Sequence, residues 1–136
     1  MTEMMKAVRQ HAFGGPEVLS YEDAPIPRPA RGEIRIRVLA ASLNPPDWYL
    51  RDGYRALPPE WRPEGAFPLI LGTDVSGVVD LAGEGVTGFA PGDEVYAMVR
   101  FPDALMEGAG AHAEYVTVPA NQVGHKPAGI GHQQAA

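Results

Sequence analysis

Glycine and proline interrupt this chain so often that it cannot form long regular elements. The 136 residues include 16 glycines and 14 prolines, spread along the whole sequence without a repeat or a low-complexity tract. Both residues tend to end helices and strands, because proline lacks a backbone donor and glycine loses more entropy on ordering than other residues. We therefore expect many turns, few long helices and a series of short strands.

The segments between these residues have the pattern of β-strands. The clearest spans residues 33–43, where isoleucine and valine alternate with Arg35 and Arg37, as in a strand with one buried face. Six or seven short strands of this kind favour a mainly β fold with one or two short helices, arranged as a partly open β-barrel. The other expected strands cover residues 5–13, 18–24, 75–82, 94–99, 111–118 and 122–126.

A short helix is expected after the strand at 33–43, and another near the end of the chain. Asn44 is a suitable N-cap and Pro45 suits the first helical position, while residues 130–136 resemble the opening turn of a helix. Neighbouring helix residues point about 100° apart, so Trp48 and Tyr49 cannot both face one cleft. We expect Trp48 to face the core.

Two segments without a clear hydrophobic period are expected to be loops. Residues 54–68 contain four prolines, and residues 101–110 form the second loop. Loops longer than about 12 residues within a compact domain are uncommon unless they are functional or disordered. Because the first loop carries Tyr54, Trp61 and Phe67, we interpret it as a candidate binding lid.

The charge and the composition exclude several classes of protein. With 11 Lys and Arg against 17 Asp and Glu, the net charge is −6, whereas nucleic-acid binding and polybasic membrane attachment need clustered cations. The absence of cysteine excludes disulfides, thiolate nucleophiles and cysteine-ligated zinc. No apolar run reaches the ~20 residues that span a bilayer, and the first residues lack the features of a signal peptide. We therefore expect a cytoplasmic protein that binds neither nucleic acid nor membranes.

The segment LILGTDVSGVV, residues 69–79, interrupts a buried β-like run with polar residues. From the residues alone, Thr73 and Asp74 allow two interpretations. In the first, they form a turn at the start of a strand, with Asp74 bonded to nearby backbone amides. In the second, they face a functional site. Asn44 has the same two alternatives, because a helix N-cap can also present its side chain to a site.

Six motifs, read in order along the chain, resemble one known family. They are KAVRQHAFGGPEVL, AASLNPPDWYLRDG, GTDVSGVV, PGDEVYAM, GAHAEYVTVP and KPAGIGHQQAA. They are similar to the N-terminal domain of the medium-chain dehydrogenases/reductases, and most of all to the zinc-independent quinone oxidoreductase branch, the zeta-crystallin-like enzymes. Each motif alone is weak, but six in order at ordinary spacing are specific, and they extend from about Met5 to the last residue.

The resemblance implies a GroES-like β-barrel over residues 1–127 that serves as catalytic and substrate domain, followed at 128–136 by the start of a helix that leads to a Rossmann domain. In the family that second domain binds NADPH, but no strand-GxGxxG-helix unit occurs in these 136 residues. We therefore expect the catalytic-domain portion of a zinc-independent NAD(P)H-dependent quinone oxidoreductase or enone reductase, inactive without its nucleotide-binding domain. Its partners would be a small quinone or enone substrate and that missing domain. An apolar patch at the docking surface would also allow a homodimer.

The resemblance also assigns roles to four side chains. Zinc-dependent relatives carry a metal-binding histidine at the position of Thr73 and a ligand cysteine at that of Asn44, and neither replacement suits zinc. We therefore expect no zinc and a site refitted for hydrogen bonding. In the quinone oxidoreductase branch, the positions of Asn44, Tyr49 and Thr73 face the nicotinamide end of the cofactor, so these are the expected catalytic and cofactor-binding residues. Tyr54 matches an aromatic residue near the substrate entrance, and it is the expected substrate-binding residue.

Two other functions stay open at the level of the sequence. One is a stand-alone GroES-like binding module without enzymatic activity, which a stop codon directly after Ala136 would favour. The other is a chaperonin-like ring former, against which the absence of a recognisable mobile-loop pattern counts. For the enzyme, we expect Asn44, Tyr49 and Thr73 to converge on one cleft, at the barrel surface nearest the C-terminal segment.

Overall fold

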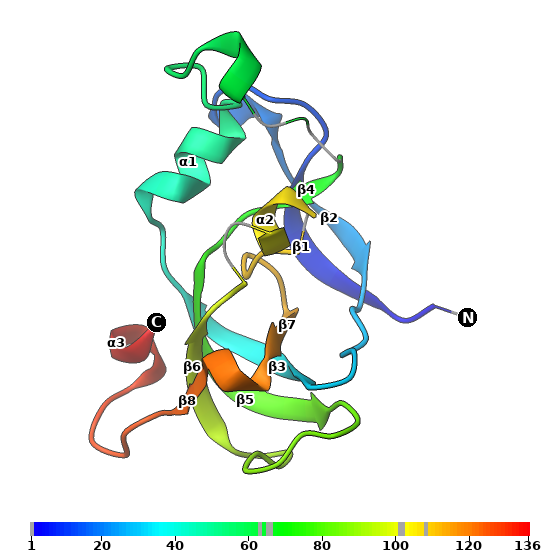
Figure 1. Ribbon diagram of the computed structural model, residues 1–136, viewed down its shortest axis with the longest axis vertical. Coiled ribbons are helices and arrows are strands. Elements are labelled where there is room, and N and C mark those ends of the chain that lie inside the picture. Colours follow the sequence, from blue (N-terminus) through cyan, green and yellow to red (C-terminus); the bar gives the residue numbers. More distant parts are fainter. Residues whose placement is uncertain (1, 63, 65–66, 101–102, 108) are drawn as a thin grey trace.

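The computed structural model describes residues 2–62, 64, 67–100, 103–107 and 109–136. These residues fold into two antiparallel sheets, of which the larger curls into a half-barrel (Figure 1). The smaller sheet has the strand order β2-β1-β4, and the larger one has the order β7-β3-β5-β6-β8. The expected mainly β, partly open barrel is therefore confirmed. The strands are β1 (Met4–Gln10), β2 (Leu19–Pro25), β3 (Glu33–Ala41), β4 (Leu69–Ile70), β5 (Asp74–Ala82), β6 (Glu94–Met98), β7 (Tyr115–Pro119) and β8 (Val123–His125).

Short helical segments connect the strands. Helix α1 (Pro45–Arg51) follows β3, and α3 (His132–Ala135) follows β8, as expected from the sequence. Helix α2 (Asp103–Met106) lies within the expected loop 101–110, of which residues 101, 102 and 108 lie outside the described residues. In the described part of the chain, no helix has the length and apolar character needed to cross a membrane. Among the described residues, 3-10 turns occur as η1 (Pro16–Val18), η2 (Pro59–Trp61) and η3 (Ala120–Gln122).

The core of the larger sheet forms from the alternating apolar residues that the sequence shows. Ile34 and Ile36 of β3 pack with Val75 and Val79 of β5, and all four are at most 1% exposed. A strand with one buried face must alternate in this way, because successive side chains point to opposite sides. The pattern accordingly locates five strands within two residues of their observed ends, namely those expected at 18–24, 33–43, 75–82, 94–99 and 122–126.

The expected strand at 5–13 ends earlier, as β1 at Gln10. The Gln10 side chain is fully buried, and its Nε2 donates to the backbone carbonyls of Ala12 at 3.0 Å and Arg51 at 3.1 Å. The chain after Gln10 therefore turns toward the end of α1 and does not continue along the sheet.

The expected strand at 111–118 begins four residues late, as β7. The backbone N–H of Ala111 donates instead to the carbonyl of Gly72 at 2.9 Å, and Ala113 forms an isolated bridge with Ala7 of β1. Residues 111–114 thus connect the two sheets. Strand β4, which pairs with β1, was not expected, because two residues are too few for a period to be visible.

The candidate lid at 54–68 contains η2, and residues 63, 65 and 66 lie outside the described part. Arg62 closes its first half, because Nε donates to the Leu57 carbonyl at 2.9 Å and Nη2 to the Arg55 carbonyl at 3.1 Å. Trp61, at the tip of this closed turn, is 70% exposed.

Candidate functional site

Asp47 brings the start of helix α1 against the segment that precedes β5. This carboxylate is only 1% exposed. Its Oδ2 accepts the backbone N–H of Asn44 at 2.8 Å, and its Oδ1 accepts the backbone N–H of Gly72, also at 2.8 Å. A buried carboxylate is stable only when such donors satisfy it. Asp47 therefore holds residues 44 and 72 at a fixed separation, although they are far apart in the sequence.

Gly72 is required by the backbone at this point. Its φ is +109°, a conformation that L side chains rarely adopt, and an added Cβ would lie 2.8 Å from the backbone nitrogen of His112. The segment that connects the two sheets passes this close to Gly72. The glycine thus allows three pieces of backbone, from α1, β5 and the connecting segment, to meet beside the site.

Asp74 joins two of the predicted site residues. Its Oδ2 accepts Asn44 Nδ2 at 2.6 Å and Thr73 Oγ1 at 2.6 Å. The structure therefore brings Asn44 and Thr73 together on one carboxylate oxygen. Thr73 is only 3% exposed, whereas Asn44 and Asp74 are partly exposed and face a cleft.

The cleft beside Asn44 and Asp74 has a volume of about 720 Å³, which is in the range of small-molecule sites. One wall is the outer side of β6, with Tyr96 and Met98, and another is the end of the chain at α3. The cleft lies near the C-terminal segment, but of the three residues expected to converge on one cleft there, only Asn44 lines it. The lining residues are Ser42, Asn44, Asp74, Tyr96, Ala97, Met98, Asn121, Gln122, Val123, Gly124, Ala135 and Ala136.

Tyr49 is not among the residues that line this cleft. It lies on α1, five residues after Asn44, which corresponds to about 7 Å along a helix. Its ring centroid is 4.1 Å from that of Trp48 and 6.0 Å from that of Tyr54. The structure therefore groups Tyr49 with the other aromatic residues of α1 and the lid, apart from Asn44 and Thr73.

The expectation that Trp48 faces the core is wrong. Trp48 is 46% exposed and Tyr49 is 40% exposed, whereas Leu50 is only 2% exposed. Leu50 and Asp47 are three residues apart and share the inward face of α1. That face packs Leu50 on the apolar side chains of the β4 segment, so the tryptophan is turned outward.

Tyr54 stands at the start of the lid in a left-handed conformation, with φ of 54°, which is uncommon for a residue with a side chain. It packs against the cluster formed by Leu50, Leu69 and Leu71. Burial, followed by the nearby Asp47 carboxylate and Tyr49, raises the pKa of the Tyr54 phenol above its ordinary value of 10.0. The shift matters only at alkaline pH, because a phenol with a pKa near 10 already holds its proton at neutral pH.

Asp74 has no role among those that the resemblance assigns, yet it faces the cleft beside Asn44. The signal was present in the period of β5, because Asp74 and Ser76 alternate with buried Val75 and so share the opposite face of the strand. What the pattern could not show is that Asn44, 30 residues away, reaches the same carboxylate. Within the described residues, no three His, Cys, Asp or Glu side chains are arranged to hold a metal ion.

Comparison with known proteins places this architecture in a family. The family model described as the alcohol dehydrogenase GroES-like domain matches residues 30–128. The chain belongs to this family. The matched range includes the Asn44 and Thr73 positions and all strands of the larger sheet.

Three proteins show what this GroES-like domain is similar to. A quinone oxidoreductase of Sus scrofa is 33% identical over 135 residues, which are 98% of this chain and 37% of that protein. The structure of the quinone oxidoreductase from Coxiella burnetii matches with a TM-score of 0.83 and 32% identity, over 98% of this chain and 40% of that one. A mycobacterial protein solved in complex with NADPH matches with a TM-score of 0.75 and 29% identity, over 96% of this chain and 36% of that one.

The GroES-like domain therefore spans about two fifths of the length of these proteins. The expected resemblance to the quinone oxidoreductase branch of the medium-chain dehydrogenases/reductases is confirmed by the matches over nearly the whole chain.

Proposed function

We propose that this chain is the catalytic-domain portion of a zinc-independent, NAD(P)H-dependent quinone oxidoreductase or enone reductase. The observation that carries the proposal is the convergence of Asn44 and Thr73 on Asp74 Oδ2, at the edge of a cleft of suitable size. The resemblance to quinone oxidoreductases supports the reaction class.

The side chains at this edge fit the nicotinamide end of the cofactor. A nicotinamide carboxamide carries one N–H₂ donor and one carbonyl acceptor. Because Asp74 holds the amide nitrogen of Asn44, the side-chain carbonyl of Asn44 can accept a carboxamide N–H. When bound, NADPH would supply the hydride, and this chain would orient the ring and the acceptor. The NADPH complex of a structural neighbour supports that choice of cofactor.

Thr73 and Asp74 preorganise the site and do not need to move. Thr73 has a β-branched side chain, and it is buried and bonded to Asp74 through its hydroxyl. It therefore fixes the Asp74 carboxylate, which in turn fixes Asn44. A rigid amide at the cleft costs little reorganisation when a ligand binds. We therefore assign the contact with the cofactor to Asn44, and the support of that contact to Thr73.

We propose that Tyr49 and Tyr54 contact the quinone or enone that accepts the hydride. They stand together, 6.0 Å apart at their ring centroids, on the side of α1 that leads into the lid. A protonated phenol can donate a hydrogen bond to the oxygen of a quinone or enone as negative charge develops on it. The Tyr54 phenol, whose ordinary pKa lies near 10 and is raised here, carries its proton at physiological pH as any tyrosine does.

The proposed reaction works without zinc. The positions that carry zinc ligands in the zinc-dependent relatives hold an amide and a hydroxyl here, those of Asn44 and Thr73. Both groups donate to Asp74. Neutral oxygen and nitrogen groups of this kind suit hydrogen bonding better than tetrahedral zinc. Elemental analysis of the purified protein should find less than one zinc per ten chains, and one zinc per chain would contradict this part of the proposal.

We further propose that residues 1–127 are the catalytic domain and that residues 128–136 start the connection to a nucleotide-binding domain. The lengths of the relatives, which exceed this chain about 2.5-fold, support this division. On this basis the chain alone should not oxidise NADPH in the presence of a quinone. A cytoplasmic location and a homodimer formed through exposed apolar side chains remain predictions.

The site can be tested with a probe that carries only the nicotinamide half of the cofactor. Reduced nicotinamide mononucleotide is titrated into the ¹⁵N-labelled chain, and the side-chain amide signals are followed by NMR. The Asn44 amide signal should shift with a dissociation constant in the millimolar range, which corresponds to about −4 kcal/mol. Adenosine monophosphate, the other half of the cofactor, is the control ligand and should leave this signal unchanged.

Two variants show whether binding depends on Asn44. Asn44→Ala should abolish the saturable shifts of the backbone amide signals around the cleft, whereas Gln133→Ala removes an exposed amide outside the cleft and should leave them intact. Wild-type chain that shows no shift at Asn44, or equal shifts with adenosine monophosphate, would overturn the assignment.

A further inference from the structure

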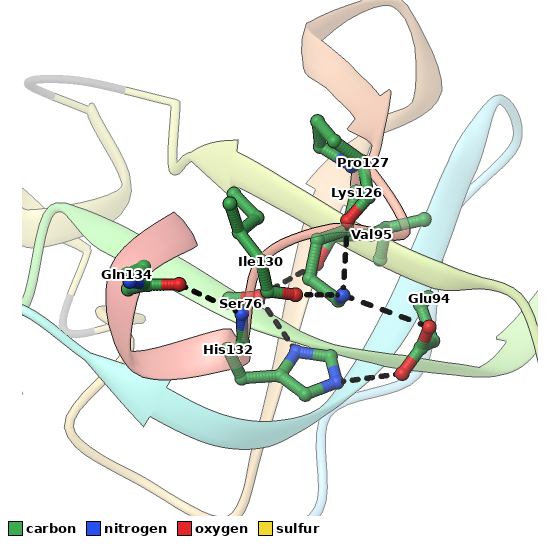
Figure 2. Close-up of polar contacts among 9 residues, drawn as sticks. Ser76, Glu94, Val95, Lys126, Pro127, Ile130, His132 and Gln134 are labelled. Carbon is green, nitrogen blue, oxygen red and sulfur yellow. Dashed lines mark hydrogen bonds and ion pairs between the residues drawn. The ribbon is translucent and has the colours of Figure 1, made fainter.

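The C-terminal segment, residues 126–136, folds back onto the outer face of β5 and β6 (Figure 2). Ser76 of β5 and Glu94 of β6 point to this face, opposite the core residues Val75 and Val95. Figure 2 shows His132 of α3 lying between the Ser76 and Glu94 side chains. The segment is thus attached to the sheet by side chains, and not by backbone pairing alone.

Glu94 contacts two basic side chains of this segment, one with each oxygen. Its Oε1 lies 3.2 Å from His132 Nε2, and its Oε2 lies 3.7 Å from Lys126 Nζ. The backbone carbonyl of Glu94 also accepts the backbone N–H of Lys126 at 3.0 Å. One residue of β6 therefore holds both ends of the connection between β8 and α3.

Lys126 shapes the chain between these two ends. Only 4% of its side chain is exposed, although it carries an ammonium group. The ammonium donates to the backbone carbonyls of Ile130 at 2.5 Å and Pro127 at 3.2 Å (Figure 2). Because a buried cation needs such partners, the carbonyls are drawn around it and residues 127–130 form a closed turn.

His132 connects the helix to the strand below it. Its Nδ1 lies 2.7 Å from Ser76 Oγ, and Ser76 is fully buried. The Ser76 hydroxyl also donates to the Val95 carbonyl at 3.2 Å, and Nε2 lies 3.2 Å from Glu94 Oε1, so both ring nitrogens have a hydrogen-bond partner, with donor and acceptor roles that depend on the tautomer. The ring is therefore fixed from both sides, and it fixes the first turn of α3.

The end of this segment is also a wall of the cleft. Ala135 and Ala136 line the cleft together with Asn44 and Asp74. On β5, Asp74 faces the cleft and Ser76 faces His132, two residues further along the same side of the strand. Any shift of α3 away from Ser76 would therefore open the cleft beside Asp74.

We propose that Glu94 is a positioning residue for the cofactor cleft. It holds Lys126 and His132 together, and these hold the Ala135–Ala136 wall opposite Asn44. This role rests on the proposed function only where a nicotinamide ligand is concerned; the attachment of α3 stands without it. Glu94 itself does not line the cleft, so it would affect binding only through the position of the wall.

The attachment is tested by hydrogen exchange of the α3 backbone amides. The N–H groups of Gln134 and Ala135 donate to the Gly131 carbonyl and exchange only when the first turn of α3 opens. Glu94→Gln should speed up their exchange by about threefold or more, because a neutral side chain holds both His132 and the Lys126 ammonium less strongly. The matched control is Glu22→Gln, which removes the carboxylate of another His–Glu pair, formed with His11 at 2.6 Å; it should leave α3 unchanged.

A second variant tests whether Glu94 holds α3 through its contact with His132. His132→Asn keeps a polar group near Ser76 but cannot reach Glu94. It should speed up the α3 exchange as Glu94→Gln does, and the double variant should add little to either single change. Fully additive effects, or unchanged exchange in Glu94→Gln, would overturn the proposal.

Reduced nicotinamide mononucleotide is then titrated into the same variants. In Glu94→Gln the Asn44 amide signal should still shift, but with a dissociation constant about fivefold higher, because the wall is mobile. An unchanged dissociation constant together with faster α3 exchange would show that α3 does not position the site. If the wild type does not bind this ligand at all, the proposed function fails, whereas the hydrogen-exchange result still decides whether Glu94 holds α3.

Discussion

Asp47 Oδ1 accepts the backbone N–H of Gly72 at 2.8 Å, across 25 residues of sequence. This bond joins the first turn of α1 to the segment that enters β5. Together with the bond from Asp47 Oδ2 to the Asn44 backbone, it fixes the distance between the two halves of the site. The first prediction follows from this arrangement.

Asp47→Asn should lower the free energy of unfolding by about 2 kcal/mol, because hydrogen bonds to a charged group are each worth roughly 1.5–3 kcal/mol. An amide has one oxygen for two donors, and its NH₂ group would then face a backbone N–H. Urea denaturation measures the change. The control is Asp52→Asn at the end of α1, where the carboxylate accepts, among the described residues, only the Arg55 N–H at 3.3 Å. Equal effects of the two substitutions would contradict the bridging role of Asp47.

Gly72→Ala tests whether the close approach of the connecting segment matters in addition to backbone conformation. Gly92→Ala is the matched control, because its φ of +97° is similar to the +109° of Gly72 but nothing lies within 4 Å of an added Cβ. The control should lose about 1 kcal/mol of stability from backbone strain alone. Gly72→Ala should lose about 3 kcal/mol or more, because His112 and Ala111 must also move. Equal losses would show that the contact is not important.

The main features of the fold could be predicted from the sequence because they follow from local patterns. A buried face forces the alternation that located β3 and β5, and Asn44-Pro45 is a local start signal for α1. Residues 111–114 could not be placed in this way, because their backbone partners lie on two other segments of the chain. The inward position of Leu50 instead of Trp48 was equally inaccessible, because it depends on which apolar surface α1 meets.

The same distinction between local patterns and contacts of distant segments applies to the candidate site. Asn44 and Thr73 could be singled out because the family resemblance assigns a role to both positions. Their common partner could not be foreseen, because the bond from Asn44 to Asp74 depends on how the bridge through Asp47 sets the two segments.

Asn44 and Thr73 should be energetically coupled through Asp74. Asn44→Ala and Thr73→Val each remove one donor from the same oxygen, and each should cost about 1 kcal/mol of folding stability. The double variant should differ from the sum by about 0.5 kcal/mol or more. Asn44→Ala combined with Thr87→Val, at an exposed threonine, is the control pair and should be additive. Additivity in both pairs would mean that Asp74 does not link the two residues.

The raised pKa of Tyr54 predicts a loss of stability at high pH. A phenol whose pKa is higher in the folded than in the unfolded protein favours folding while it is neutral in both states. That contribution is complete below the unfolded pKa of about 10 and is lost as the pH rises through the folded pKa. The stability of the wild type should therefore fall more steeply above pH 10 than that of Tyr54→Phe. The difference between the ultraviolet pH titrations of the two proteins should place the Tyr54 transition above pH 10.0. Parallel profiles of stability against pH would contradict the raised pKa of Tyr54.

The most direct test of the account is a crystal structure of this chain with reduced nicotinamide mononucleotide bound. We expect the carboxamide of the ring within about 3 Å of the Asn44 side chain, with Asn44 and Thr73 still on Asp74 Oδ2 and α3 closing the cleft. A ring bound away from Asn44, or Asn44 and Thr73 on separate partners in the complex, would contradict the central claim that these residues form one cofactor-binding edge.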